Sequence, residues 1–328
     1  MLDKIREIEN RITNGGRIET DEALSLMELT GGTLYDLFPS ANRLARHFKG
    51  YEVELCGIIN AKSGRCAEDC AFCSQSSCHD TAAPVYELVP SSEMLKKSLE
   101  AAKICADRFG IVTSGTAVDS EEEIGSIAEA VRGMKESGAI LPCASLGMLG
   151  AQELGRLKAA GLSRYHHNLE VARSYFPNIC TTHAYDDDVE TVRAAQRAGL
   201  EVCSGGIFGV GESRAQRVEL AETLRELGVA SVPINFLVPV PGTPLADAKP
   251  LPPLESLKII AVYRFMLPRA TIKVCAGRDR NLGDLASWIF YAGANAMMIG
   301  DYLTTAGRTP ALDLKMIRDL GFRPVAGS

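Results

Sequence analysis

The chain contains 328 residues with a formal net charge of −6; 46% of the residues are hydrophobic and 23% are charged. This is a globular composition, and the chain is long enough to bury a large core. The acidic balance argues against nucleic acid as a partner, because binding phosphates needs clustered Lys and Arg. The N-terminus alternates acidic and basic side chains and no apolar run approaches about 18 residues, so we expect neither a signal peptide nor a membrane span. A cytoplasmic protein is expected.

In chain order, helical patterns come first. Residues 1–50 indicate an N-terminal helical extension, in which one helix starts after Thr20 as its cap. Over residues 51–328, short β-rich runs alternate with amphipathic segments, which is typical of βα units around a parallel sheet. This alternation predicts an α/β fold, a (β/α)8 barrel of the TIM type. The expected strands cover residues 53–59, 109–114, 139–146, 163–169, 200–206, 231–237, 271–277 and 295–300.

Two connecting segments carry specific expectations. The proline-rich run PVPGTPLADAKPLPP at residues 239–253 predicts a loop over one mouth of the barrel. The pattern SSEMLKKSLEAAKICADRF at residues 91–109 predicts a helix with Cys105 packed on its apolar face.

Three of the ten cysteines, Cys66, Cys70 and Cys73, follow the first expected strand within eight positions. In a barrel this is the C-terminal face, where active sites of the fold are built. In a reducing compartment, clustered cysteines are more often metal ligands or catalytic thiols than disulfides. Three thiolates can hold three irons of a four-iron cluster and leave the fourth iron exchangeable, whereas structural zinc prefers four closed ligands. The spacing therefore predicts a [4Fe-4S] cluster, with a zinc loop as the alternative.

The CxxxCxxC spacing after the first barrel strand resembles the radical S-adenosylmethionine superfamily, in which an aromatic residue such as Phe72 often lies between the last two cysteines. The segments NAKSGRCAEDCAFCSQS, YHHNLE, TTHAY, VCSGGIFGVGES, VPINFLVPVPGTPL, AGR and YLTT resemble the biotin synthases, in order, over residues 60–305. The resemblance implies conversion of dethiobiotin to biotin by radical sulfur insertion, with S-adenosylmethionine as a cofactor. It also implies a homodimer and a small reducing protein such as flavodoxin or ferredoxin.

Two alternatives remain open at this point. Hydrogenase maturases and methylornithine synthases share the cluster loop, although VCSGGI, VPIN and GTPL are less expected in them. The second alternative is a non-catalytic iron- or zinc-binding protein, because a cysteine cluster alone shows ligation and not chemistry.

Four further cysteines lie on the first, third, fifth and seventh expected strands: Cys56, Cys143, Cys203 and Cys275. Inward side chains of alternate barrel strands form layers of four, so these thiols are expected to converge. Each alone is typical of a small buried core residue. Together they favour a second metal cluster, provided that the registers hold, because a shift of one residue turns a side chain outward.

Typical biotin synthases hold a two-iron cluster inside the barrel with three cysteines and an arginine, and the resemblance implies a site at the corresponding positions of this chain. The matching positions here are Thr113, Cys143, Cys203 and Lys273. One cysteine and the arginine are therefore missing, while Cys56 and Cys275 take positions where relatives usually have serine. We expect an auxiliary iron–sulfur cluster of a different composition, with four irons favoured over two, held by Cys56, Cys143, Cys203 and Cys275. A sulfide of that cluster is expected to supply the sulfur, with Lys273 as a charge partner.

The resemblance also assigns contacts to S-adenosylmethionine. Asn168 and Glu170 match residues that contact the ribose, and Gly205 and Gly206 allow close backbone approach. Relatives commonly bind the methionyl carboxylate with an arginine where this chain has Asp188. Arg173 is the expected replacement, because a guanidinium can bind a carboxylate through two parallel hydrogen bonds.

The remaining assignments concern the substrate and structural residues. The triplet Asp186–Asp188 is expected to cap the helix that follows. Asn235 can donate to and accept from a ureido ring, and Arg278 is expected in a structural ion pair. Cys180 is expected to be structural, and Cys78 is interpreted as a loop thiol or an alternative ligand. The residues expected to contact dethiobiotin are His166, Asn235, Thr304 and Thr305.

Overall fold

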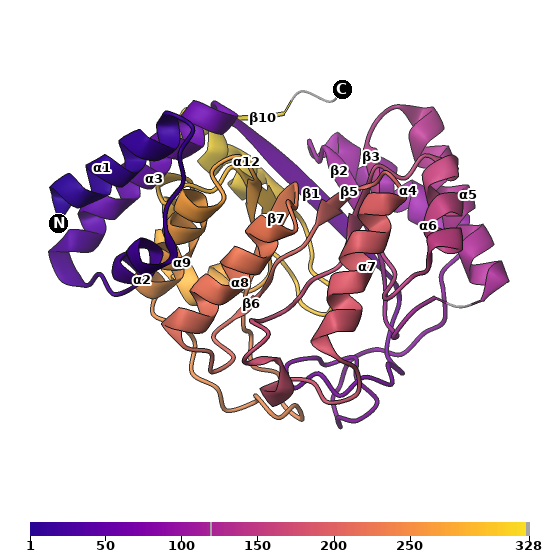
Figure 1. Cartoon of the computed structure of the whole chain (residues 1–328). Helices are drawn as coiled ribbons and strands as arrows, with labels where there is room; N and C mark the ends of the chain where they lie inside the picture. The colour runs from indigo at the N-terminus through magenta and orange to yellow at the C-terminus, as the bar shows by residue number, and fades with distance from the viewer. Residues whose placement is uncertain (119, 326–328) are drawn as a thin grey trace.

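Eight parallel strands close into a barrel in the computed structural model, which describes residues 1–118 and 120–325 (Figure 1). The predicted fold is confirmed, and each of the eight expected strands is present. Closure comes from β1, which pairs with β2 on one side and with β9 on the other. The barrel strands are β1 (Glu52–Lys62), β2 (Arg108–Thr113), β3 (Leu141–Ser145), β4 (Arg164–His166), β5 (Glu201–Cys203), β7 (Ser231–Phe236), β8 (Thr271–Val274) and β9 (Ala296–Met298).

Helices alternate with these strands and cover the outside of the barrel (Figure 1). They are α4 (Ser91–Lys103), α5 (Glu121–Ser137), α6 (Ala151–Ala160), α7 (Tyr185–Arg197), α8 (Arg214–Glu226) and α9 (Pro253–Met266). The start of α5 is fixed by Ser120, whose hydroxyl accepts a hydrogen bond from the Glu123 amide. Ser213 caps α8 in the same way through the Gln216 amide. Such caps satisfy amide groups that have no partner inside the helix.

The N-terminal extension is helical, as predicted, with α1 (Leu2–Thr13), α2 (Thr20–Met27), the short 3₁₀ segment η1 (Gly31–Thr33) and α3 (Leu34–Lys49). It packs on the outer face of α9, which explains why α9 is buried all round and not only on one stripe. Arg43 of α3 donates to both carboxylate oxygens of Glu9 in α1 at 2.6 Å. The expected cap is wrong by one residue, because Glu19 is the cap and Thr20 is already helical.

The C-terminal part adds η3 (Gly283–Leu285), α10 (Arg278–Leu282), α11 (Trp288–Tyr291), α12 (Pro310–Asp319) and the short strand β10 (Arg323–Pro324), which pairs with β1. Arg278 donates to Asp313 Oδ2 at 2.8 Å, and both side chains are buried. The expected structural ion pair of Arg278 is confirmed, and it ties α10 to α12.

Two other features differ from the sequence-based expectations. The helix α4 ends at Lys103, and Cys105 lies beyond it with a φ of 64° and an exposed side chain, so its predicted packing is wrong. A further short strand, β6 (Gly206–Phe208), pairs with β7, and the 3₁₀ segment η2 (Phe176–Asn178) precedes α7.

Within residues 1–118 and 120–325, no helix combines the length and the apolar character required to cross a bilayer.

Candidate active site

A cavity of about 340 Å³ extends from the loop after β1 into the barrel interior. Phe72 and Cys73 line it at the mouth, and Val240 lines it from the proline-rich loop at residues 239–253. The position of that loop over the mouth of the barrel is therefore confirmed. The same cavity is lined by four cysteines, the thiol ring: Cys56, Cys143, Cys203 and Cys275.

The cluster loop, residues 63–80, carries Cys66, Cys70 and Cys73 at the C-terminal end of β1, as expected. Its turns are held by backbone hydrogen bonds, with the Cys73 amide donating to the Cys70 carbonyl at 2.9 Å and the Cys66 amide donating to Gln75 at 3.2 Å. Burial is the main influence on all three thiols and raises their pKa values. Cys78 lies on the same loop with an exposed side chain.

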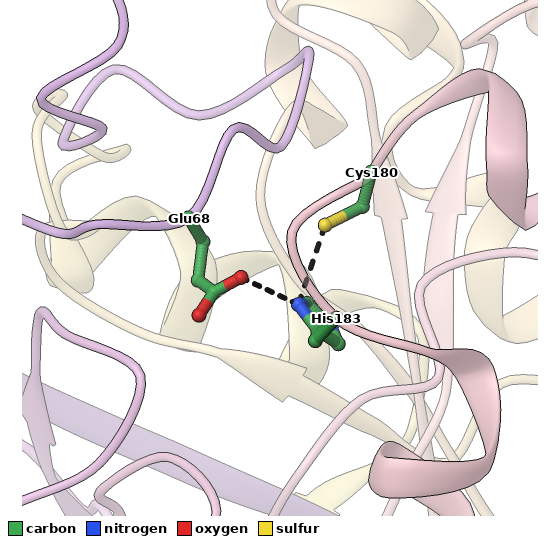
Figure 2. Close-up of side chains that lie close together, drawn as sticks. All are labelled: Glu68, Cys180 and His183. Atoms are coloured by element: carbon green, nitrogen blue, oxygen red, sulfur yellow. Dashed lines mark hydrogen bonds and ion pairs between the residues drawn. The ribbon is translucent and has the colours of Figure 1, made fainter.

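Side chains from the loop before α7 hold the cluster loop in place (Figure 2). His183 Nδ1 lies 2.6 Å from Glu68 Oε2 and 3.3 Å from Cys180 Sγ, and Asp188 lies 3.4 Å from the other ring nitrogen. Burial lowers the pKa of His183, but the carboxylates of Asp188 and Glu68 outweigh it and raise this pKa to about 9. Cys180 Sγ lies 3.9 Å from Cys70 Sγ, so this buried thiol supports a cluster-loop cysteine directly.

Registers between strands place the thiol ring. Cys143 on β3 lies beside Gly110 on β2, and Gly110 also lines the cavity. Thr113 lies three residues further along β2, beside Lys62, and is not among the residues that line the cavity. The match of Thr113 to the missing ligand position is therefore wrong, because residues an odd number apart on a strand point to opposite faces.

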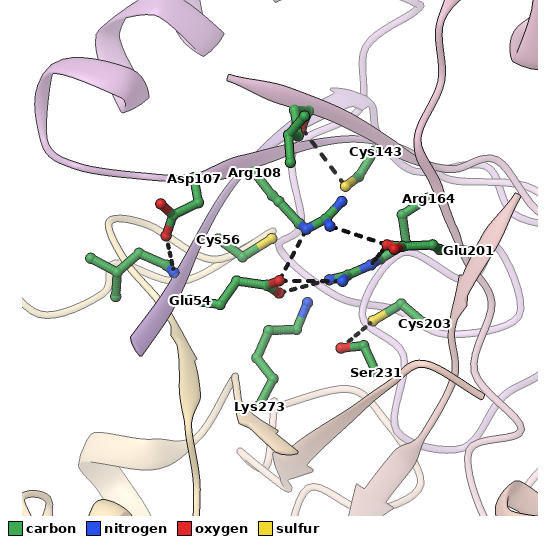
Figure 3. A network of polar contacts seen from close by, with 12 residues as sticks. Glu54, Cys56, Asp107, Arg108, Cys143, Arg164, Glu201, Cys203, Ser231 and Lys273 are labelled. Carbon is green, nitrogen blue, oxygen red and sulfur yellow. Dashed lines mark hydrogen bonds and ion pairs between the residues drawn. The ribbon is translucent and has the colours of Figure 1, made fainter. Parts of the chain in front are cut away.

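An ion network lies beneath the thiol ring, toward the amino-terminal ends of the strands (Figure 3); its arginines are buried, whereas the Glu201 side chain is half exposed. We call it the barrel floor: Glu54, Arg108, Arg164 and Glu201. Glu54 accepts from Arg164 at 2.7 Å and from Arg108 at 3.0 Å. Burial raises the pKa of Glu54, but the guanidinium of Arg164, followed by Lys273 and Arg108, outweighs it and holds this pKa at about 2.

The thiol ring differs electrostatically from one member to the next. Burial raises the pKa of Cys56 to about 11 and that of Cys275 to about 12. Burial also raises the pKa of Cys203, but the Lys273 ammonium and His166 outweigh it and bring this pKa to about 5. The cavity therefore favours a thiolate at Cys203 before any ligand binds.

The donor atoms of both cysteine sets fit iron–sulfur clusters. Thiolate sulfur is the soft ligand that such clusters use, and the ligands must be deprotonated. Three thiols at the mouth match a four-iron cluster with one iron left for another ligand. The Lys273 ammonium favours the thiolate form at all four inner thiols, but burial outweighs it at Cys56, Cys143 and Cys275 and raises their pKa values, so only the pKa of Cys203 is lowered.

Asn168 and Glu170, the residues expected to contact the ribose, follow β4 and line the cavity. Asn168 Nδ2 donates to Glu170 Oε2 at 3.4 Å. Glu170 has a φ of 61°, and its carbonyl accepts from the Ile207 amide at 2.8 Å. Burial raises the pKa of its carboxyl to about 8. A neutral carboxyl can both donate to and accept from a ligand hydroxyl.

Gly205 and Gly206, which follow β5, are packed closely against the backbone of neighbouring segments. A Cβ atom at Gly205 would lie 2.1 Å from the Pro233 carbonyl oxygen, and one at Gly206 would lie 2.1 Å from that of Glu170. Neither glycine is among the residues that line the cavity. The strand packing around them therefore requires glycine, and this differs from the expected approach to a cofactor.

Arg173 lies away from the cavity. Its guanidinium donates to both carboxylate oxygens of Asp186, at 2.9 and 2.7 Å, and lies over the Tyr185 ring. The side chains of Arg173 and Asp186 are more than half exposed. This placement speaks against the expected contact with the methionyl carboxylate.

The three aspartates at residues 186–188 have different roles. Asp187 accepts from the Ala184 amide at 2.9 Å and so caps α7, as predicted. Asp188 is buried and accepts from His167 at 2.8 Å, so it serves the cluster-loop support and not the cap. The sequence did not indicate this role, although Cys180, His183 and Asp188 all fall within nine residues.

All four expected substrate residues line the cavity: His166, Asn235, Thr304 and Thr305. The side-chain amide of Asn235 is already engaged, since Nδ2 donates to the Gly206 carbonyl and Oδ1 accepts from the Ala276 amide, both at 3.2 Å. Thr304 Oγ1 lies 3.4 Å from Ser74 Oγ, which joins the threonine pair to the cluster loop.

Comparisons with solved structures agree with this architecture. A methylornithine synthase aligns with a TM-score of 0.83 at 19% identity over 98% of both chains. A maturase of the [FeFe]-hydrogenase aligns with a TM-score of 0.84 at 15% identity, covering 99% of this chain and 76% of that one. At these identities the likeness shows the fold alone.

Comparisons of sequence go further. The family model of the radical SAM superfamily matches residues 61–224, and that of the biotin and thiamin synthesis associated domain matches residues 233–323. A biotin synthase of Geobacter sulfurreducens is 54% identical over 98% of both chains, and one of Geotalea uraniireducens is 52% identical over 98% of this chain and 97% of its own. The chain therefore belongs to the biotin synthase family of the radical SAM superfamily.

Proposed function

We propose that this protein converts dethiobiotin to biotin by inserting sulfur between two unactivated carbons. One observation carries the proposal: a single cavity links the cluster loop at the barrel mouth to four thiols in the interior. Such a cavity can hold a substrate between a site that generates a radical and a site that stores sulfur. Family membership supports the same reaction.

At the mouth, Cys66, Cys70 and Cys73 would hold the [4Fe-4S] cluster, and S-adenosylmethionine would bind beside it. When bound, this pair supplies the 5′-deoxyadenosyl radical that abstracts hydrogen from the substrate. The residues of the chain bind and orient the cofactor, with Phe72 at the mouth and Asn168 and Glu170 offering polar groups to the ribose. The walls of the cavity exclude water from the carbon radical.

In the interior, the thiol ring would hold the auxiliary iron–sulfur cluster, for which we favour four irons. Four thiols can provide one ligand to each iron of a cubane-type cluster. Gly110 offers no donor at the position beside Cys143, whereas Cys56 and Cys275 add two thiols that line the same cavity.

The substrate residues are assigned by their chemistry. Thr304 and Thr305 have hydroxyls suited to the carboxylate tail, and His166 on β4 and Asn235 on β7 lie on barrel strands, where the ureido ring would bind. Because the Asn235 amide already has two backbone partners, it is expected to contribute one additional hydrogen bond.

We infer further properties from the family. Flavodoxin or ferredoxin would supply electrons, and the protein would act in the cytoplasm as a homodimer. The division into an extension at residues 1–50 and a barrel domain at residues 51–328 also remains a proposal.

An anaerobic assay tests the proposed reaction. Reconstituted protein is given dethiobiotin, S-adenosylmethionine and a reductant, and biotin and 5′-deoxyadenosine are measured by mass spectrometry. We expect both products from the parent protein and neither from Cys73→Ser, whereas Cys105→Ser, at an exposed thiol away from the cavity, keeps both. Deoxyadenosine without biotin would favour another radical enzyme, and zinc without acid-labile sulfide would favour a non-catalytic metal-binding protein.

A further inference from the structure

Lys273 is a buried cation without a carboxylate partner among the described residues. It lies on β8 with 5% of its surface exposed and lines the cavity. Figure 3 shows its ammonium pointing toward Glu54, with Cys56 and Cys203 among the side chains drawn around it. Over the described parts of the chain, however, no carboxylate forms a salt bridge with it, because Glu54 is bonded by Arg108 and Arg164.

An ammonium in this position needs a negative charge in the cavity. Burying an unpaired charge is unfavourable by several kcal/mol unless an anion faces it. The two guanidiniums of the barrel floor share Glu54 and Glu201, so their charges are already compensated. Three thiols of the ring, Cys56, Cys203 and Cys275, line the same cavity as the ammonium.

The chemistry of a lysine limits what it can do there. An ammonium has three donors and no lone pair, so in its charged form it cannot ligate a metal ion. It can donate hydrogen bonds to an anion, and sulfide sulfur in iron–sulfur clusters accepts such bonds. No protein sulfur or oxygen of the described residues accepts a bond from Lys273, so its donors are available to a ligand.

We propose that Lys273 is a positioning residue that holds an inorganic sulfide of the auxiliary cluster by hydrogen bonding and raises the reduction potential of that cluster. This inference rests on the proposed function, since it requires a cluster on the thiol ring. Position 273 thereby acts on the cluster through its charge and not as a ligand. The positive charge stabilises the reduced cluster, which carries one more negative charge than the oxidised cluster.

The test isolates the auxiliary cluster from the cluster at the mouth. Cys66, Cys70 and Cys73 are replaced by serine, and the protein is reconstituted anaerobically with iron and sulfide. In this background, Lys273→Met removes the charge at similar size, Lys273→Gln keeps polarity without charge, and Lys273→Arg keeps the charge. Lys258→Met is the matched control, because Lys258 is also buried but pairs with Glu255, and neither residue lines the cavity.

Iron and sulfide content, electron paramagnetic resonance spectra and the midpoint potential are measured for each variant. We expect a more negative potential and an altered spectrum in Lys273→Met and Lys273→Gln, recovery toward the parent in Lys273→Arg, and no change in Lys258→Met. Loss of iron only in the two neutral variants also supports the proposal.

Two outcomes would contradict the proposal, and they can be told apart. Equal potentials and spectra in the parent, Lys273→Met and Lys273→Gln would overturn the role of Lys273 while leaving the auxiliary cluster in place. If the parent of this background holds no iron and sulfide, the auxiliary cluster itself fails, and the role of Lys273 fails with it.

Discussion

Cys275 differs from the other thiols of the ring because it lies just past the end of its strand. Its amide donates to the Ile234 carbonyl at 2.9 Å, so the backbone continues the sheet pairing for one residue and directs the side chain into the cavity. The residue is 3% exposed, and burial raises the pKa of its thiol to about 12. Without an ion to displace the proton, this thiol stays neutral.

Replacing Cys275 by Ser tests its role as a ligand. A hydroxyl binds iron more weakly than a thiolate, so we expect the affinity for the auxiliary cluster to fall by at least about tenfold. Iron and acid-labile sulfide per chain, measured after anaerobic reconstitution, should decrease relative to the parent. Cys105→Ser serves as the control, since this exposed thiol lies outside the cavity. An unchanged count in Cys275→Ser would contradict the four-thiol ring.

Single residues also show what the sequence could predict. Cys56, Cys143 and Cys203 were predictable as inward-facing, because alternation along a strand has a fixed period of two. The residue that lies beside Cys143 on β2, Gly110, could not be predicted, because it depends on the register between neighbouring strands. The register of β1 and β2 shifts between Asn60 and Lys62. The support that Cys180 gives to Cys70 depends on two loops that meet only in the folded chain.

At the scale of elements, the crowded turn from β5 into β6 controls how the strands fit together. Leu169 donates to the Gly205 carbonyl, and the Gly205 amide donates to Asn168 Oδ1 at 3.2 Å. This turn therefore also fixes the segment that carries Asn168 and Glu170. Space at Gly205 is limited by the backbone of β7.

Gly205→Ala is expected to lower the free energy of unfolding by about 3 kcal/mol, because the added methyl group collides with a carbonyl that cannot rotate away. The matched control is Gly125→Ala in α5, where no atom lies within 4 Å of the added Cβ. This change should stabilise the protein by up to about 1 kcal/mol, since alanine favours helix. Denaturant titration of both variants checks the contrast, and equal stabilities would contradict it.

Most elements were predictable because the βα alternation is regular and the strands are apolar. The elements that the sequence did not predict are short or lie at the ends of other elements. β6 and β10 span three and two residues, too few to show a period, and they form only because a neighbouring strand pairs with them. The helix α4 ends before Cys105 because the chain must turn to enter β2, which the local pattern does not reveal.

At the scale of the whole molecule, the barrel floor joins β1, β2, β4 and β5 at their amino-terminal ends. The pKa of Glu54 is about 2 in the folded protein, below its ordinary value of 4.5. A carboxyl with a lowered pKa stabilises the fold above its ordinary pKa, and this contribution is lost as the pH falls toward the folded pKa. The floor should therefore weaken between about pH 4.5 and pH 2.

Glu54→Gln is expected to reduce the free energy of unfolding by about 3 kcal/mol at pH 7. The difference between parent and variant should shrink as the pH falls from 4.5 to 2, because the parent then loses the same charge. Denaturant titrations across this range measure it. Glu190→Gln, which removes an exposed partner of Arg197, should change stability by less than about 0.5 kcal/mol. A constant gap between parent and Glu54→Gln would argue against the charge of Glu54 as the cause.

Ion pairs close much of the barrel at its amino-terminal end, and the cavity extends toward the cluster loop at the opposite end. If the thiol ring supplies the sulfur, as we propose, substrate and product would pass the cluster loop, and so would the iron or sulfide that restores the interior afterwards. On that proposal, the product would have to leave the cavity before the auxiliary cluster is restored. Each molecule would then complete one turnover at a time, and the rate of product release would limit how soon the next turnover begins.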